Sequence, residues 1–146
     1  NENEWGCKYA DTIDKIMSAE LSVIQDDYDR AIHGEYAGSV LARGWHEVDK
    51  FWIGLRSSFP AAKFSIEHQI GRQDENMPPR AALRWILEGK HDGWGVFGKP
   101  TGADVYIMGM AHVEYGALVT GIPKIRKEYV LYDEVAIWKQ ILLKTG

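Results

Sequence analysis

The 146-residue sequence contains only one cysteine, Cys7, so no disulfide can form within the chain. Proteins without disulfides are typical of reducing compartments, and we therefore expect a cytoplasmic protein. A lone cysteine more often serves as a small apolar side chain than as a nucleophile, so Cys7 does not indicate thiol chemistry.

The sequence also lacks the patterns of proteins that bind nucleic acids, membranes or metals. Its 17 lysines and arginines are scattered and the net charge is −4, which argues against a nucleic-acid partner. No apolar run is long enough to span a membrane, and no segment has the pattern of a signal peptide, so we expect neither a membrane span nor a secretion signal. The histidines form no H-x-x-x-H or H-x-H pair, so we expect no metal site.

Two common catalytic or cofactor motifs are missing as well. Gly93, Gly95 and Gly98 have the spacing of G-x-G-x-x-G, but the bulky Trp94 and Phe97 fill the intervals. Neither a flanking β-α-β unit nor a downstream acidic partner accompanies them, which argues against a dinucleotide or phosphate loop. No G-x-S-x-G nucleophile elbow occurs.

The composition that remains is that of an ordinary globular domain. A hydrophobic share of 45% and a charged share of 26% predict one domain over residues 1–146, with residues 1–7 poorly ordered. Six tryptophans and seven tyrosines supply many flat side chains, which build cores and also line ligand cavities.

Hydrophobic periodicity predicts helices first and long strands later. Apolar residues recur at helical spacing over residues 8–17, 21–28 and 45–58, and residues 31–40 suggest an irregular strand pair. Alternation predicts strands over residues 64–70, 80–88, 105–113 and 125–132, followed by a helix or tail over residues 133–143. Consecutive strands joined by turns pair antiparallel, so we expect an α+β fold with helices covering one face of the sheet.

Several short motifs occur in one order along the chain. They are Trp85, Gly89-Lys90-His91-Asp92-Gly93, Pro100-Thr101-Gly102, Lys124-Ile125, Tyr132-Asp133 and Gln140-Ile141. A helix that starts after Gly44 and ends at Phe59-Pro60 precedes them. Over residues 13–143 this order resembles the SnoaL-like branch of the nuclear transport factor 2-like superfamily.

The resemblance implies a cone-shaped α+β barrel, in which a strongly curved antiparallel sheet and its covering helices enclose a deep apolar pocket. It also implies dimerisation through the sheet. Members include polyketide cyclases that close rings by acid–base aldol chemistry without a cofactor, so we expect no cofactor. In those cyclases a histidine and an aspartate face the pocket from positions that correspond to His112 and Val130. Because valine cannot move a proton, Val130 argues against a cyclase of the known type.

His112 is the first candidate catalytic residue. It shares a strand face with Tyr106, Met108 and Met110, where a partly buried histidine could act as an acid or base near neutral pH. The alternative is a core histidine hydrogen-bonded to the backbone.

Glu128, on the last strand, is the second candidate. If its face meets that of His112 across the hairpin, the two side chains would form an acid–base couple. Burial beside tyrosines would raise the pKa of Glu128 toward the value that a general base requires. The alternative is an exposed glutamate that pairs with Arg126 or Lys127.

Nine further residues are candidates for the pocket wall: His33, Trp52, Trp85, His91, Trp94, Tyr106, Met108, Met110 and Tyr132. His91 and Trp94 lie on the glycine-rich loop, and loops at a cavity rim often hold ligand contacts. The alternative for them is a tight structural loop with Trp94 as its plug, and for His33 a surface turn.

Two functions are consistent with these features. The first is a cofactor-independent acid–base enzyme (cyclase, isomerase, dehydratase or hydrolase) that acts on a hydrophobic small molecule through His112 and Glu128. The second is a non-catalytic module that binds an apolar small ligand in the same pocket. In both cases a homodimer is expected, because an open sheet face rich in aromatic residues favours a covering partner.

Overall fold

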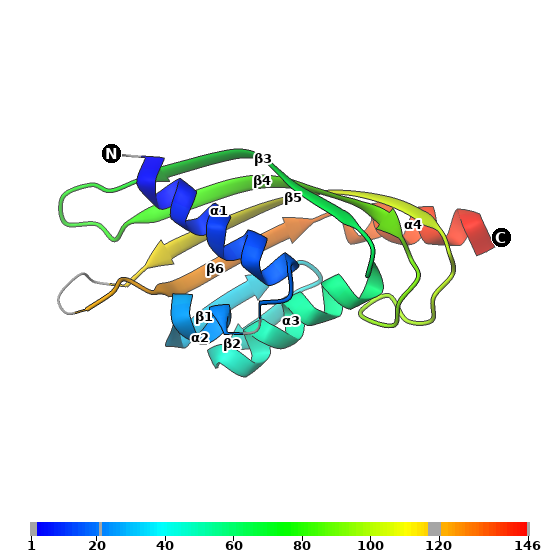
Figure 1. Ribbon diagram of the computed structural model, residues 1–146, viewed down its shortest axis with the longest axis horizontal. Coiled ribbons are helices and arrows are strands. Elements are labelled where there is room, and N and C mark those ends of the chain that lie inside the picture. The colour runs from blue at the N-terminus through cyan, green and yellow to red at the C-terminus, as the bar shows by residue number, and fades with distance from the viewer. Residues whose placement is uncertain (1–2, 21, 117–120, 146) are drawn as a thin grey trace.

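A strongly bent six-stranded sheet organises the computed structural model, which describes residues 3–20, 22–116 and 121–145 (Figure 1). Its strands are β1 (Tyr28–Tyr36), β2 (Val40–Arg43), β3 (Lys63–Arg72), β4 (Arg80–Lys90), β5 (Asp104–Tyr115) and β6 (Ile125–Tyr132). They lie in the order β2-β1-β6-β5-β4-β3. This confirms the α+β class with a mostly antiparallel sheet, in which β1 and β6 pair in parallel.

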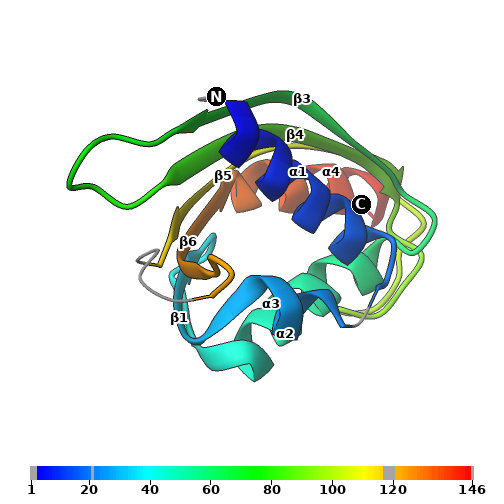
Figure 2. The same cartoon turned by 60° about the vertical axis from the view of Figure 1, so that its left-hand side comes forward.

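The helices are α1 (Asn3–Met17), α2 (Val23–Asp27), α3 (Gly44–Ser58) and α4 (Glu134–Thr145). Figure 2 shows α1 crossing the hollow side of the sheet, with α2 and α3 closing the same side beneath it. Asn3 to Cys7 belong to α1, whereas the sequence predicted a poorly ordered start; residues 1 and 2 lie outside the described residues. Leu21, placed in the second helix from the sequence, also lies outside them.

Inward-facing side chains of β4 and β5 fit together in the core. Trp85 is fully buried and lies opposite Gly109 in the strand register. A Cβ at position 109 would lie 2.1 Å from the Trp85 ring, so only glycine lets the indole lie flat against β5. The alternate residues of β5, including Met108 and Met110, therefore point to the outer face.

The glycine-rich loop between β4 and β5 packs on the C-terminal end of α3. The Gly93 N–H donates to the Ser58 carbonyl (3.2 Å) and the Val96 N–H to the Gly54 carbonyl (3.3 Å). These bonds satisfy carbonyls that a helix end leaves without partners. A Cβ at Gly93 would lie 1.8 Å from the Ser57 carbonyl oxygen, so this loop needs a glycine to approach the helix.

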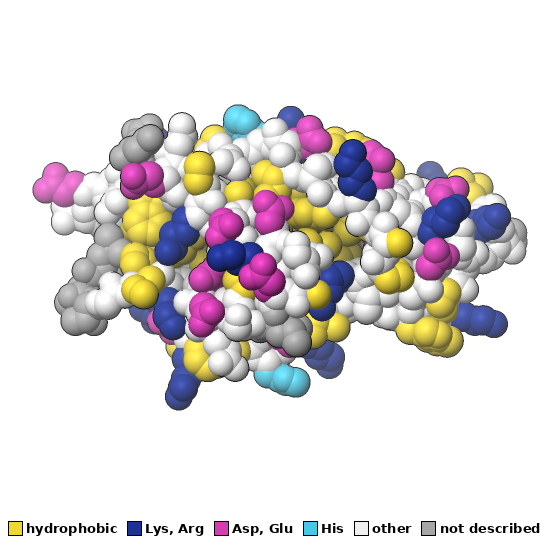
Figure 3. All heavy atoms as spheres, in the orientation of Figure 1, with side chains coloured by type: hydrophobic (Ala, Val, Ile, Leu, Met, Phe, Trp, Pro, Cys, Tyr) yellow, Lys and Arg dark blue, Asp and Glu magenta, His cyan; other side chains and the backbone are white. Residues whose placement is uncertain are grey.

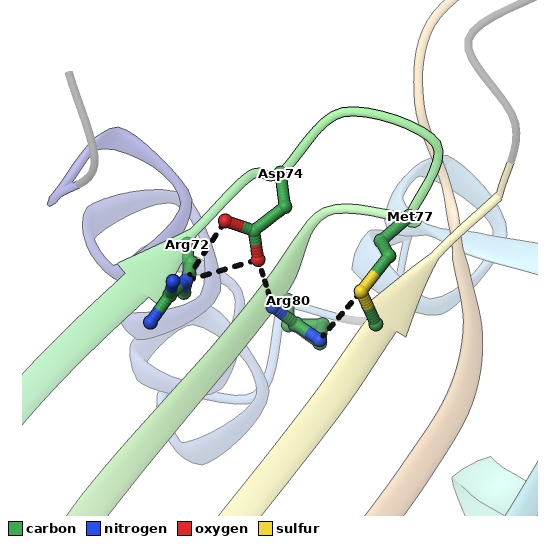
Figure 4. Close-up of polar contacts among 4 residues, drawn as sticks. All are labelled: Arg72, Asp74, Met77 and Arg80. Atoms are coloured by element: carbon green, nitrogen blue, oxygen red, sulfur yellow. Dashed lines mark hydrogen bonds and ion pairs between the residues drawn. The ribbon is translucent and has the colours of Figure 1, made fainter.

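An ionic cluster fixes the hairpin between β3 and β4 (Figure 4). The Asp74 carboxylate accepts from Arg72 Nε at 2.9 Å and from Arg80 Nη2, and Arg80 Nη1 also contacts the Met77 sulfur. The guanidinium groups, Arg72 first, hold the pKa of Asp74 below its usual value. The cluster thus joins both strands at the hairpin.

Charges of both signs are interspersed over the face of the molecule seen in Figure 3. Within the described residues, no helix combines the length and the apolar character needed to cross a membrane.

Candidate functional site

The Glu128 carboxylate lies in the core, on the inward face of β6, and its side chain is 0% exposed. Its Oε2 atom accepts hydrogen bonds from the hydroxyls of Tyr9 (2.7 Å) and Tyr28 (2.6 Å). Its Oε1 atom accepts from the Tyr36 hydroxyl (2.8 Å) and from the indole N–H of Trp52 (3.1 Å). We call these five residues the Glu128 cluster.

Four elements bring the cluster together: Tyr9 comes from α1, Tyr28 and Tyr36 from the two ends of β1, and Trp52 from α3. The parallel pairing of β1 with β6 is what aligns the tyrosines of β1 with the carboxylate. Gly34 lies directly beside Glu128 in this register, and a Cβ there would lie 2.6 Å from the Tyr36 ring. Glycine at position 34 therefore leaves room for the ring whose hydroxyl reaches Glu128.

The hydrogen bonds match the capacity of an ionised carboxylate, which only accepts and offers about four lone-pair positions. Burial raises the pKa of Glu128, while the hydrogen bonds from Tyr28, Tyr9, Tyr36 and Trp52 act in the opposite direction. Among the described residues, no lysine, arginine or histidine bonds to Glu128, so its charge is compensated by neutral donors alone.

The tyrosines of the cluster are held in their neutral form. Burial and the nearby Glu128 charge raise the pKa values of Tyr9, Tyr28 and Tyr36 well above the usual 10.0. A neutral hydroxyl can donate to an oxyanion, and a desolvated carboxylate can accept a proton. Chemically, the cluster can therefore transfer a proton and stabilise an oxyanion in a site without water-exposed charge.

His112 lies on the opposite side of the sheet. It faces Tyr129 of β6, with ring centroids 5.9 Å apart, whereas Glu128 faces Val113. Burial lowers the pKa of the half-buried His112. The expected acid–base couple of His112 with Glu128 is wrong. His112 lies beside Tyr129, and Tyr129 and Glu128, as adjacent residues of β6, point to opposite faces of the sheet.

Four predicted wall residues also lie away from the concave side. Tyr106, Met108 and Met110 share the outer face with His112 and are 45%, 53% and 59% exposed. Trp94 is exposed on the glycine-rich loop. The buried aromatic side chain of this loop is Phe97, not Trp94. These positions correct the prediction that the four residues line the inner pocket.

The remaining predicted residues divide between the core and the surface. Trp85 is buried against Phe64 and Tyr132, at centroid distances of 5.6 and 6.1 Å, and its indole N–H has no partner among the described residues. His91 is buried and its Nδ1 lies 2.9 Å from the Thr101 hydroxyl, an arrangement that organises the loop. His33 lies on the outer side of β1.

His33 lines a surface groove of about 800 Å³ that also includes Met77, Pro79 and Lys127. This groove lies at the end of the sheet where the β3–β4 hairpin projects, and it does not include Glu128. The structure therefore separates His33 from the other predicted pocket residues.

Sequence patterns do not single out the three tyrosines that hold Glu128. Tyr9 lies within the helix predicted over residues 8–17, and Tyr28 ends the helix predicted over residues 21–28. Tyr28 and Tyr36 are eight positions apart, so they share a face if residues 28–36 form one strand. That spacing is the sequence signal for two of the three tyrosines.

Neither a known family model nor a curated protein sequence matches the chain. Several solved structures, in contrast, match almost the whole chain. A candidate SnoaL-like polyketide cyclase from Jannaschia sp. CCS1 superposes with a TM-score of 0.72 at 12% identity, covering 97% of this chain and 96% of that one. AclR, a candidate hydroxylase from Streptomyces galilaeus, gives a TM-score of 0.72 at 15% identity over 98% and 83% of the two chains.

A third structure, IdmH, a candidate polyketide cyclase from Streptomyces antibioticus, has a TM-score of 0.66 at 15% identity. The match covers 90% of this chain and 96% of IdmH. At such identities the likeness shows the fold and leaves the activity open. The chain has the nuclear transport factor 2-like fold of the SnoaL-like polyketide cyclases, as the resemblance implied.

Proposed function

We propose that this protein is a cofactor-independent acid–base enzyme that acts on an apolar small molecule, with Glu128 as its base. The observation that supports the proposal is the fully buried Glu128 carboxylate, whose hydrogen-bond donors among the described residues are all neutral. Burying a charge without a cation is costly, and strongly perturbed carboxylates inside a fold concentrate at functional sites.

In the proposed reaction, Glu128 removes a proton from a carbon next to a carbonyl group of the substrate. The electron pair of the broken C–H bond moves to the carbonyl oxygen and forms an enolate. A tyrosine hydroxyl of the cluster, or the Trp52 indole N–H, donates a hydrogen bond to that oxygen. Glu128 then returns the proton to the γ-carbon of a conjugated enolate, which completes an isomerisation. If the enolate carbon instead adds to a second carbonyl group of the substrate, Glu128 returns the proton to the alkoxide oxygen that this addition forms.

Position 130 supports the choice of Glu128 over His112. The resemblance placed the cyclase aspartate at Val130, which faces the core and is 0% exposed. Glu128 is the preceding inward-facing residue on the same strand, as its pairing with Val113 and that of Val130 with Ala111 require. A carboxylate is thus present on the expected face of the expected strand, two positions earlier in the sequence.

The experiment is a screen for hydrogen–deuterium exchange next to the carbonyl group in a panel of lipophilic ketones and diketones. We expect the wild-type protein to accelerate exchange, and Glu128→Gln to lower that rate by about a hundredfold or more. His112→Ala serves as the matched control and should retain the rate, because His112 lies on the other face of the sheet.

The binding-module alternative gives a different result in the same experiment. If panel members bind the wild-type protein but none of them exchanges faster, the protein is a binding module. If His112→Ala loses the rate and Glu128→Gln keeps it, the assignment of the base is wrong.

We also propose a homodimer that forms through the outer face of the sheet. Met108, Met110 and Leu131 are neighbours on this face and are more than half exposed, and Tyr106 is nearly so. A contiguous apolar face of this kind favours a second copy as its cover. Met110→Asp should shift the sedimentation coefficient from dimer to monomer, whereas a monomeric wild-type protein would contradict the proposal.

A further inference from the structure

A second apolar groove, of about 530 Å³, lies between β2, α3 and the glycine-rich loop. Its lining residues are Val40, Leu41, Glu47, Lys50, Phe51, Gly54, Gly95 and Val96. The apolar side chains at its rim are well exposed, with Leu41 at 61% and Val96 at 49%. The groove therefore presents an apolar surface to solvent next to an edge strand of the sheet.

Phe51 connects this groove to the Glu128 cluster. Its ring stacks face to face on Tyr36, at a centroid distance of 3.9 Å and an angle of 5°, and meets Trp52 edge-on at 5.0 Å. Tyr36 and Trp52 are the two donors to Oε1 of Glu128. Phe51 is thus a groove residue in direct contact with half of the donors that hold the buried carboxylate.

Two glycines form the end wall of the groove, where the loop meets α3. A Cβ at Gly54 would lie 2.7 Å from Val96 Cγ1, and one at Gly95 would lie 2.4 Å from the Gly54 carbonyl oxygen. The Val96 N–H donates to that same carbonyl. The wall is therefore fixed by backbone contacts, and a side chain at either glycine would displace it.

The lining also defines the chemistry of an occupant. Its two charged residues, Glu47 and Lys50, have opposite signs, and Glu47 accepts a hydrogen bond from the Arg43 N–H at the start of α3. The groove thus has no net charge to attract an ion, and its other members offer aliphatic and aromatic surface. An uncharged, flat ring suits these walls, because Phe51 offers it an aromatic contact beside the aliphatic side chains.

We propose that this groove is the entry subsite for the substrate and that Phe51 selects flat, uncharged ring systems. The inference rests on the proposed function. Four donors saturate Glu128, so a substrate has to displace one of them. Phe51 is stacked on Tyr36, and Tyr36 donates to Oε1 of Glu128, so the path from the groove to Oε1 requires both rings to move.

The test uses N-phenyl-1-naphthylamine, an uncharged flat fluorescent probe, in titrations of four proteins. Wild type should bind it, and Leu41→Asp should weaken binding about tenfold, because a carboxylate at the rim disfavours an apolar ligand. Leu142→Asp is the matched control: Leu142 is similarly exposed on α4, outside the groove and the proposed dimer face, and the change should alter the affinity less than twofold. Phe51→Leu removes the stacking surface without emptying the site and should weaken binding severalfold.

Methyl NMR of the wild-type protein locates the probe. Signals of Val40, Leu41 and Val96 should shift on titration, while those of Ile70 and Leu131 should not. Shifts confined to the outer face, equal losses in Leu41→Asp and Leu142→Asp, or no binding to wild type would each overturn the entry subsite.

Glu128→Gln separates this inference from the proposed function. The variant should bind the probe as wild type does, because Glu128 does not line the groove. Probe binding at the groove together with no exchange activity in any protein would refute the enzyme proposal and leave a ring-binding groove. Exchange activity that is insensitive to Leu41→Asp and Phe51→Leu would refute the groove as the entry route.

Discussion

Glu128→Ala is expected to lower the free energy of unfolding by about 3–5 kcal/mol, because it leaves four buried donors without an acceptor. The hydroxyls of Tyr9, Tyr28 and Tyr36 can turn toward one another, so the individual penalties do not simply add. The Trp52 indole N–H only donates and has no such option. A loss of this size is a large share of the ~5–15 kcal/mol that stabilises a typical domain.

Glu128→Gln is the matched control for this prediction. The amide has the same shape, and its oxygen can still accept from Tyr36 and Trp52. Its NH₂ group can donate to Tyr9 and Tyr28, because a hydroxyl both donates and accepts. We expect a loss of about 1 kcal/mol for this variant.

Urea-induced unfolding of wild type and the two variants measures both values. Equal losses for Glu128→Ala and Glu128→Gln would show that the carboxylate charge, and not the acceptor geometry, determines the stability. No loss for Glu128→Ala would contradict the cluster as a structural unit. A folded Glu128→Gln variant is also what the exchange experiment requires, because its lost activity can then be assigned to the missing base.

The second large effect is expected above pH 10. Burial and the Glu128 charge raise the pKa values of Tyr9, Tyr28 and Tyr36 in the folded protein above the ordinary 10.0. Between the unfolded and folded pKa values, the unfolded chain has lost these protons and the folded protein keeps them. Stability is therefore intact below pH 10 and falls as the pH rises above it.

Each tyrosine contributes a slope of about 1.4 kcal/mol per pH unit in that range, so the three together give roughly 4 kcal/mol per unit. Thermal unfolding between pH 8 and 11 should show the loss, with tyrosinate absorbance at 295 nm appearing together with unfolding. Tyr36→Phe, which keeps the ring stacked on Phe51, should reduce the slope by about 1.4 kcal/mol per pH unit, the contribution of one tyrosine. Tyrosinate that forms at pH 10 in a still-folded protein, beyond what the exposed tyrosines supply, would contradict the prediction.

The order of elements and the class of fold could be predicted from the sequence. The periodicity of residues 80–88, 105–113 and 125–132 lies within the observed β4, β5 and β6. Strong local patterns of this kind depend on neighbours along the chain and need no tertiary information. Glu128 could also be singled out, because an acidic residue on an otherwise apolar strand face is unusual.

The edge of the sheet could not be predicted in the same way. Tyr28 fits the helical spacing of Ile24 and also begins β1, and only the pairing with β6 decides for the strand. That pairing is parallel and joins segments far apart in the sequence, which short-range patterns do not report. The residues that hold Glu128 are 119, 100, 92 and 76 positions away from it, so their convergence is likewise a property of the tertiary structure.

The sequence by itself determined that β5 has two alternating faces, one of them carrying His112. It did not determine which face points inward, because both faces are largely apolar and alternation is symmetric between them. Packing determines which face of β5 points inward. Trp85 needs the space above Gly109, so the face that carries Gly109 turns toward the core, and Met108, Met110 and His112 turn outward. The same choice placed Glu128 inside, among donors that only the folded chain assembles.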